Sequence, residues 1–241
     1  MSDSMNSPEL PPITPTSPPK AGAMRISVHT SATLLVFTLA FTALMAGVYQ
    51  LTKPVLDATA LDAKRRLITE VLPATTYDND LLADAIELPA NAELSLNEPT
   101  RIYRARRAGQ PVALVFEAAA LNGYSGEIRL ILAVQADGRL AAVRVTQHKE
   151  TPGLGDYIDP KKDKNKAQPW ITQFNGHNFS DTPREKWRVK KDGGVFDQHI
   201  GATISARAVT NATARALTWA LERADTLYAL PAGSQWKEKA P

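Results

Sequence analysis

A long hydrophobic stretch dominates the first quarter of the chain. Residues 30–51 read TSATLLVFTLAFTALMAGVYQL and contain no charged side chain. A helix of about 20 apolar residues is long enough to cross the hydrocarbon core of a bilayer. Tyr49 lies at one end of the stretch, where an aromatic side chain prefers the membrane interface. The pattern therefore predicts a transmembrane helix over 29–51.

A cleaved signal peptide is the alternative for this stretch. Signal peptides carry an apolar region of about 7–15 residues behind a short charged segment. Here the apolar run is longer and begins only after residue 29, so an uncleaved anchor fits better. Basic residues do not fix the orientation, since Lys20 and Arg25 precede the span while four more follow it within 53–66.

Proline marks the beginning of the chain. Six of the first 20 residues are proline, set among serine and threonine. Proline removes backbone donors and stiffens the chain in an extended form. We therefore expect a disordered tail over 1–28, with a ligand for a proline-recognition domain as the alternative.

Beyond the span, apolar residues first recur with helical spacing. They return at intervals of three and four between Pro54 and Leu72, and Pro73 ends the pattern. Pro54 suits the first turn of such a helix. We expect 52–100 to form a stalk helix and a connecting segment, with a short helix near 81–86.

The pattern then changes to the alternation that is typical of strands. Strands are predicted at 102–106 and 112–117, and at 128–135 and 139–147. The second pair is joined by Ala-Asp-Gly, and Asp-Gly between apolar runs is the strongest short hairpin signal. These residues therefore predict two antiparallel hairpins.

The remaining elements are shorter strands and one long helix. Short strands are expected at 187–190 and 195–196, and helical spacing appears at 170–174. Ser205 is expected to cap a helix over 206–229. The apolar stripe of this helix consists of Val209, Ala212, Ala216, Ala220, Ala224 and Leu227. The order of elements predicts an α+β fold, with an antiparallel-sheet domain over 101–230 and a C-terminal tail over 231–241.

The amino-acid composition excludes several classes of functional site. The chain has no cysteine, which excludes disulfides, thiolate nucleophiles and iron–sulfur clusters held by cysteine. The net charge is only +3 and no run of Lys and Arg exceeds three residues, so we expect no binding to nucleic acid. Four histidines without paired spacing predict no metal site.

Two glycine-bearing loops carry the candidate chemistry. ETPGLG at 150–155 follows a predicted strand, and DQHIGAT at 197–203 lies between a predicted strand and the long helix. Glycine lets backbone amides approach a ligand closely. A strand-to-helix turn also presents free N–H groups at the positive end of a helix dipole, which is a natural phosphate site. Taken singly, each loop is better explained by glycines that only make turns, and neither fits the P-loop or dinucleotide fingerprints.

In combination, these loops resemble the FMN-binding domain shared by the G subunit of the Rnf (Rsx) electron transport complex and the C subunit of the sodium-pumping NADH:quinone reductase. The hallmark of that family, D-x-x-[S/T]-G-A-T, reads DQHIGAT here, with Ile200 in place of the usual Ser or Thr. The ETPGLG loop, the turn GYSG at 123–126 and the lead-in WRVKKDGG at 187–194 also match. The residues after GAT are closer to the Rnf protein than to its counterpart in the quinone reductase.

The resemblance implies a covalent FMN, joined by a phosphoester bond to Thr203. It implies that a separate flavin transferase takes the FMN from FAD, with Mg²⁺ assisting. It further implies an electron carrier, not catalytic alone, that works with the other subunits of an Rnf complex. The location implied is the bacterial inner membrane, with the FMN domain in the periplasm. The residues implied in cofactor binding are Thr203, Gly201, Ala202, Asp197, Glu150, Thr151, Pro152, Gly153, Leu154, Gly155 and Tyr124.

Several roles stay open. Leu154 is expected to pack on the flavin ring, and Tyr124 either stacks on the ring or is a core tyrosine at a turn. Asp197 either assists attachment, by deprotonation or by positioning the loop, or is only a turn residue. Two other functions also remain: a flavoprotein of another respiratory or redox-sensing pathway, and a non-redox cell-envelope binding domain, which only Ile200 favours.

Overall fold

A computed structural model describes residues 20–237 of the chain. They form two units that divide between Ala60 and Leu61. Residues 1–19, which hold most of the predicted tail, lie outside the described residues, as do residues 238–241. Helix α1 (Lys20–Val71) already begins at Lys20, so the last part of the predicted tail is helical rather than disordered.

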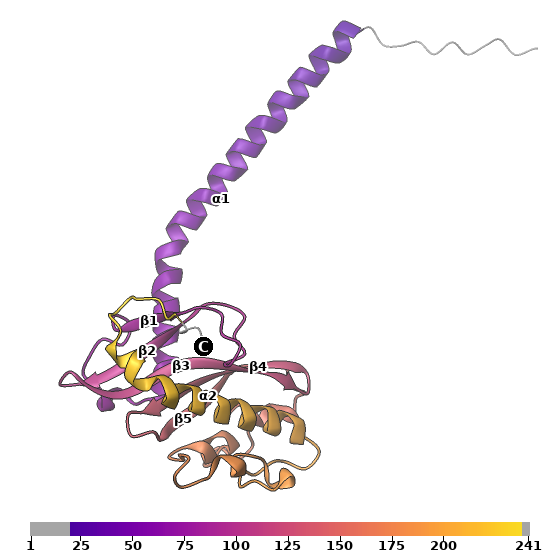
Figure 1. The fold of residues 1–241 in the computed structure, drawn as a ribbon. Coiled ribbons are helices and arrows are strands. Elements are labelled where there is room, and N and C mark those ends of the chain that lie inside the picture. The colour runs from indigo at the N-terminus through magenta and orange to yellow at the C-terminus, as the bar shows by residue number, and fades with distance from the viewer. Residues whose placement is uncertain (1–19, 238–241) are drawn as a thin grey trace, which may run out of the picture. The chain divides into compact units, whose positions relative to one another are not determined.

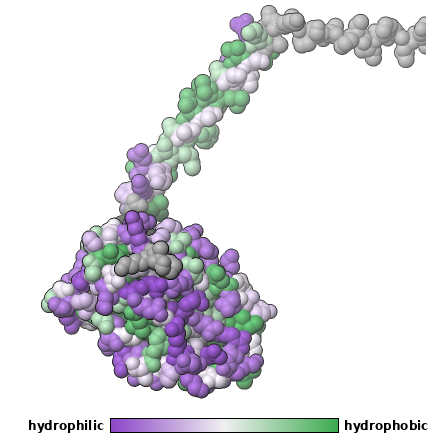
Figure 2. Space-filling view, viewed as in Figure 1, coloured by the Kyte–Doolittle hydropathy of each residue, from purple (hydrophilic) through white to green (hydrophobic). Residues whose placement is uncertain are grey.

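The part of α1 in the first unit carries the hydrophobic stretch. Residues Met24–Pro54 are long and apolar enough to cross a membrane. Their large apolar side chains are exposed, and Figure 2 shows the hydrophobic colouring along this helix. The helix also runs through Pro54, the residue that we expected in the first turn of the stalk helix. Proline removes one backbone hydrogen bond, and the helix continues on both sides of it.

The second unit is built on a five-stranded antiparallel sheet (Figure 1). Its strands follow chain order: β1 (Ala85–Leu88), β2 (Thr100–Arg107), β3 (Gln110–Gly123), β4 (Gly126–Gln135) and β5 (Leu140–Gln147). The four strands predicted between 102 and 147 are confirmed as β2 to β5. Gly138 adopts a φ of 87° in the predicted Asp-Gly turn. Helices before and after the sheet confirm the α+β fold.

Strand β1 stands where a short helix was expected near 81–86. Ile86 and Leu88 are buried while Glu87 between them is exposed, which is the alternation of a strand. Ile86 lies opposite Ile102 of β2, so the neighbouring strand supplies the backbone partners. The strand is too short for its alternation to stand out in the sequence.

Each face of the sheet carries its own hydrophobic cluster. One face packs against α2 (Thr203–Ala229), which Figure 1 shows lying across the sheet. Leu114 and Phe116 of β3 belong to this cluster. Val115, between them, faces the other way and packs with Leu72, next to the end of α1.

Helix α2 begins at Thr203 rather than after Ser205, where the cap was expected. Ser205 lies in the first turn with its side chain buried, and its hydroxyl donates to the carboxyl of Glu150. The predicted stripe is confirmed as the buried face of the helix, with Ala224 partly buried and the other five residues fully so.

Residues 148–202, between β5 and α2, contain loops and short 3₁₀ helices but no strand. The strands expected at 187–190 and 195–196 are therefore wrong. Within this stretch, Val189 and Phe196 form an isolated bridge instead of a ladder.

Aromatic packing takes the place of sheet pairing in this stretch. The helical spacing at 170–174 is confirmed as a 3₁₀ helix, Trp170–Phe174. Trp187 and Phe196 are both buried, with ring centroids 5.0 Å apart. The apolar residues that suggested strands are thus core residues of a loop region.

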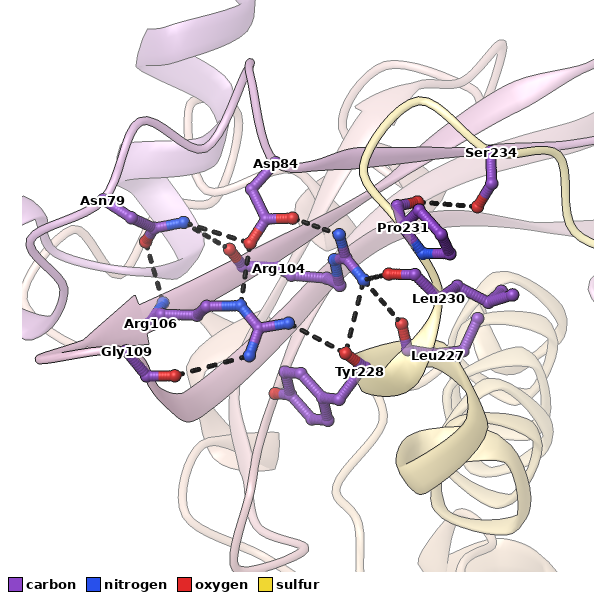
Figure 3. A network of polar contacts seen from close by, with 10 residues as sticks. All are labelled: Asn79, Asp84, Arg104, Arg106, Gly109, Leu227, Tyr228, Leu230, Pro231 and Ser234. Carbon is purple, nitrogen blue, oxygen red and sulfur yellow. Dashed lines mark hydrogen bonds and ion pairs between the residues drawn. The ribbon is translucent and has the colours of Figure 1, made fainter.

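A buried arginine anchors the C-terminal end of α2 (Figure 3). Arg104 of β2 donates to the carbonyl oxygens of Leu227, at 3.0 Å, and of Leu230. It also pairs with Asp84, whose other carboxylate oxygen lies 2.8 Å from Nε of Arg106. The last carbonyls of a helix have no partner within it, and a cation there interacts favourably with the helix dipole. Arg104 therefore fixes this end of α2 to the sheet.

The folded unit is wider than the predicted domain 101–230. It begins at Leu61 and so takes in residues of the predicted stalk and connecting segment, 52–100. Trp236, within the predicted C-terminal tail 231–241, is buried in the main cluster.

Candidate functional site

Three segments meet beside the N-terminus of α2: the turn between β3 and β4, the loop after β5, and the start of the helix. They enclose a cavity of about 130 Å³, which is lined by Tyr124, Glu150, Thr151, Leu154, Gly155, Gly201, Ala202, Ile204 and Ser205. The first seven of these residues belong to the predicted cofactor site. The structure thus brings most of that site together.

Glu150 joins the three segments. Its side chain is buried, and Oε1 accepts the backbone N–H of Ser125 in the β3–β4 turn at 3.0 Å. Oε2 accepts the hydroxyl of Ser205 in α2. The backbone N–H of Glu150 donates to Nδ1 of His148 at 3.1 Å. Because buried polar groups are costly to leave without partners, Glu150 holds the turn, the loop and the helix in one arrangement.

Two motif glycines are required by the closeness of Glu150. A Cβ atom at Gly155 would lie 2.6 Å from Oε2 of Glu150 and 2.6 Å from Oγ of Ser205. A Cβ atom at Gly123 would lie 2.8 Å from Oε1 of Glu150 and 2.4 Å from the carbonyl oxygen of Gly126. These distances leave no room for a side chain, so packing explains both glycines.

Thr203 is the first residue of α2 and is half-buried. The preceding Ala202 makes no side-chain hydrogen bond to the helix, and the first turn contains no acidic residue. The first N–H groups of a helix have no partner within it and favour an anion. Gly201 adopts a φ of 85°, which residues with a side chain rarely do. The site therefore combines a hydroxyl with backbone donors that suit a phosphate attached to it.

Asp197 lies apart from the cavity. Its carboxylate pairs with Nζ of Lys190 at 2.6 Å, and both side chains are largely exposed. Its backbone carbonyl accepts Nε1–H of Trp170 at 2.6 Å, and its N–H donates to Oε1 of Gln173 at 2.7 Å. These contacts favour the role of fixing the start of the attachment loop.

Pro152 and Gly153 also lie outside the cavity lining, and both are exposed. Gly153 adopts a φ of 75°, and its N–H donates to Oδ1 of Asp156 at 2.9 Å. The two residues shape the bend of the loop.

Exposed apolar side chains gather at the cavity. Tyr124 is 67% exposed, so the alternative of a core tyrosine is wrong. Leu154 and Ile204 also line the cavity and are 55% and 45% exposed. Such a surface suits a planar aromatic ligand. Ile200, where the chain departs from the family motif, is fully exposed and is no part of the lining.

Tyr157 and Ser205 are site residues that the sequence did not assign to the cofactor. The hydroxyl of Tyr157 accepts the N–H of His199 and donates to the carbonyl of Ala202, both at 3.2 Å. Burial raises the pKa of Tyr157. No motif marks this tyrosine; its position directly after the ETPGLG loop is the only signal in the sequence.

An ion pair ties the lead-in segment to α2. Nε and one terminal nitrogen of Arg207 lie 2.5 and 2.7 Å from the two carboxylate oxygens of Asp192. The hydrogen bond from Arg207 lowers the pKa of Asp192. Within residues 20–237, no three or more His, Asp or Glu side chains are grouped so that they could hold a metal ion.

Comparison with known proteins gives two family matches. The family described as "FMN-binding domain" matches residues 123–218, which contain the cavity and Thr203. The family described as "RnfG N-terminal region" matches residues 24–71, which lie in α1.

Similar proteins share the sequence along most of its length. The G subunit of the ion-translocating oxidoreductase complex of Pectobacterium atrosepticum is 40% identical over 185 residues, which cover 77% of this chain and 86% of that protein. The protein of the same name from Pseudomonas aeruginosa is 42% identical, with 82% and 90% covered. That of Escherichia coli (strain K12) is also 42% identical, with 83% and 94% covered.

Proposed function

Because this chain belongs to the family of the G subunit of ion-translocating oxidoreductase complexes, we propose that it is a membrane-anchored electron carrier with FMN esterified to Thr203. The single observation that supports Thr203 as the attachment residue is the structure at the start of α2. There, the half-buried Thr203 stands at the first position of a helix whose first turn has neither a side-chain cap nor an acidic residue.

The residues at this helix start fit the phosphate of FMN. A phosphate on Oγ of Thr203 carries negative charge, which the free N–H groups and the positive end of the helix dipole stabilise. The buried carboxyl of Glu150 is occupied by Ser125 and Ser205, so it is not left facing the phosphate without partners. The glycine at position 201 lets the chain turn into the helix directly before Thr203.

Thr203 acts as a nucleophile once, during maturation. Its oxygen attacks the phosphorus on the flavin side of FAD, the bond between the two phosphates breaks, and AMP leaves while the hydroxyl proton is released. We propose that a separate flavin transferase with Mg²⁺ carries out this step.

Once bound, the flavin supplies the electron transfer, and the protein supplies its position and surroundings. We propose that Tyr124, Leu154 and Ile204 contact the flavin ring, because they line the cavity and leave apolar surface exposed. The backbone of the ETPGLG loop borders the same cavity. A covalent bond at Thr203 keeps the cofactor on the protein through repeated cycles.

We further propose that the FMN domain lies in the periplasm and works with the other subunits of an Rnf complex. A covalent tether is useful there, since FMN lost by dissociation is not replaced. Alkaline phosphatase fused after residue 240 tests the topology: we expect an active fusion, and an inactive one contradicts the periplasmic location.

The attachment itself is tested by producing the full-length protein together with a flavin transferase. We expect a fluorescent band in a denaturing gel and an intact mass raised by one FMN less one water. Thr203→Ala should abolish both signals. Thr226→Ala, which changes an exposed threonine near the other end of α2, is the matched control and should keep them. An adduct that persists in Thr203→Ala contradicts the proposal.

A further inference from the structure

One side chain outside the family motifs holds the backbone of the attachment loop. The hydroxyl of Tyr157 accepts the N–H of His199 at 3.2 Å and donates to the carbonyl of Ala202 at 3.2 Å. These two bonds bracket residues 199–202, immediately before Thr203. A single hydroxyl thus connects both sides of the turn that leads into α2.

The ring of Tyr157 is itself held in place. It is 4% exposed and stacks on the His199 ring, with centroids 3.8 Å apart and planes inclined by 17°. Its other neighbour is Trp170, in an edge-on contact at 5.4 Å. Trp170 donates to the carbonyl of Asp197, so this aromatic pair contacts the loop at its beginning and at its end.

Besides these contacts, the turn at 199–202 has one backbone hydrogen bond of its own, from the N–H of Ala202 to the carbonyl of His199 at 3.2 Å. Ile200 and Gly201 are exposed, and Gly201 is in the left-handed region. Ala202 offers α2 no side-chain cap. Ordering such a turn costs conformational entropy. Contacts that hold the turn before the transferase binds lower this cost.

We propose that Tyr157 is a positioning residue that presents the hydroxyl of Thr203 to the flavin transferase. The inference rests on the proposed function and adds to it the residue that orders the acceptor. Burial raises the pKa of Tyr157 above its ordinary value of 10.0, so the hydroxyl stays protonated at neutral pH. In that form it can donate to one backbone group and accept from the other.

Tyr157→Phe tests the role with little change in shape. The variant keeps the ring, and with it the contacts to His199 and Trp170, but loses both hydrogen bonds. The measurement is the initial rate of FMN transfer from FAD to the purified, unmodified full-length protein, followed by intact mass and in-gel fluorescence. We expect the rate at low acceptor concentration to fall about tenfold, which corresponds to about 1.4 kcal/mol, the size of one or two net hydrogen bonds.

Tyr228→Phe is the matched control. Its hydroxyl is also buried, lies on α2 far along the helix from Thr203, and has no hydrogen-bond partner among the described residues. Its removal should leave the transfer rate unchanged. The KM for FAD should be the same in both variants and the wild type, because FAD binds to the transferase.

Amide hydrogen exchange separates positioning from general destabilisation. In Tyr157→Phe, exchange should accelerate at His199 and not in the paired strands β3 and β4. Acceleration throughout the sheet, together with the slower transfer, overturns a positioning role.

A second variant, His199→Ala, removes the stacked ring but leaves both backbone hydrogen bonds. Because His199 is exposed, the fold should persist, and transfer should slow less than in Tyr157→Phe. A larger effect in His199→Ala, or a wild-type rate in Tyr157→Phe, overturns the role of Tyr157 while attachment at Thr203 stands. Absence of any adduct on the wild-type protein instead overturns the proposed function.

Discussion

Replacing Arg104 with methionine should destabilise the second unit far more than replacing a neighbouring arginine of the same strand. Arg104 is 2% exposed and donates to the carbonyls of Leu227 and Leu230. Methionine fills a similar volume but donates nothing. The change therefore leaves the final carbonyls of α2 buried without their partner and removes one of the two cations beside Asp84.

The expected loss in the free energy of unfolding depends on which partners Asp84 and the carbonyls keep in Arg104→Met. Removing one partner of a buried ion pair typically costs about 3–5 kcal/mol. Asp84 keeps Arg106, whose Nε lies 2.8 Å from its carboxylate, so the carboxylate is not left alone. We therefore expect a loss near the lower limit, about 3 kcal/mol, most of it from the carbonyls.

Arg101→Met is the control on the same strand. Arg101 is 55% exposed in its side chain and pairs with Glu87 at 3.7 Å. Exposed pairs contribute about 0–1 kcal/mol, so this variant should stay within that range.

The assay is urea denaturation of the detergent-solubilised full-length protein, followed by tryptophan fluorescence. All four tryptophans lie in the second unit, at 170, 187, 219 and 236, so the signal reports on that unit alone. Equal free energies of unfolding for the two variants would refute the conclusion that Arg104 anchors α2.

Three further predictions concern the site. Gly155→Ala should reduce both stability and the yield of flavin adduct, because the new Cβ meets Glu150 and Ser205 at 2.6 Å; an unchanged thermal midpoint would argue against that packing. The free energy of unfolding should fall as pH rises above 10.0, because burial raises the pKa of Tyr157 and the folded state favours its protonated form, and part of this slope should vanish in Tyr157→Phe titrated in parallel. Ile200→Thr should leave adduct yield and stability as they are, because the side chain is fully exposed, whereas a clear gain in adduct would show that the missing hydroxyl matters.

Much of the fold could be predicted because its signals are local. The Asp-Gly turn and the alternation on either side of it specify the hairpin of β4 and β5 through neighbouring residues. The stripe along α2 repeats over the whole helix, so it identified the buried face without knowledge of what packs there.

The errors arose where distant contacts decide the local structure. Residues 85–88 form a strand because β2 lies beside them. Val189 and Phe196 are apolar because they fill an aromatic core, not because they pair in a ladder.

The candidate site, too, contains residues with a local sequence signal and residues whose role depends on distant contacts. Gly155 and Gly201 line the cavity and lie in recognisable motifs, so both could be predicted from the sequence. The motif alone did not explain why Gly155 is required, because the reason is the carboxyl of Glu150 in contact with a serine 55 residues away along the chain. Tyr157 has no sequence signal beyond its position, because its role depends on two backbone groups of a later loop.

The most direct test of the central claim is to locate the flavin within the tryptic peptide that contains the motif. Trypsin should cleave after Lys191 and Arg207 and release residues 192–207, in which Thr203 and Ser205 carry the only hydroxyl groups. Fragmentation by tandem mass spectrometry then distinguishes the two. We expect the whole FMN mass on Thr203, because Ser205 is buried and its hydroxyl is hydrogen-bonded to Glu150. FMN on Ser205, or a peptide without FMN in protein that was matured with the transferase, would contradict it.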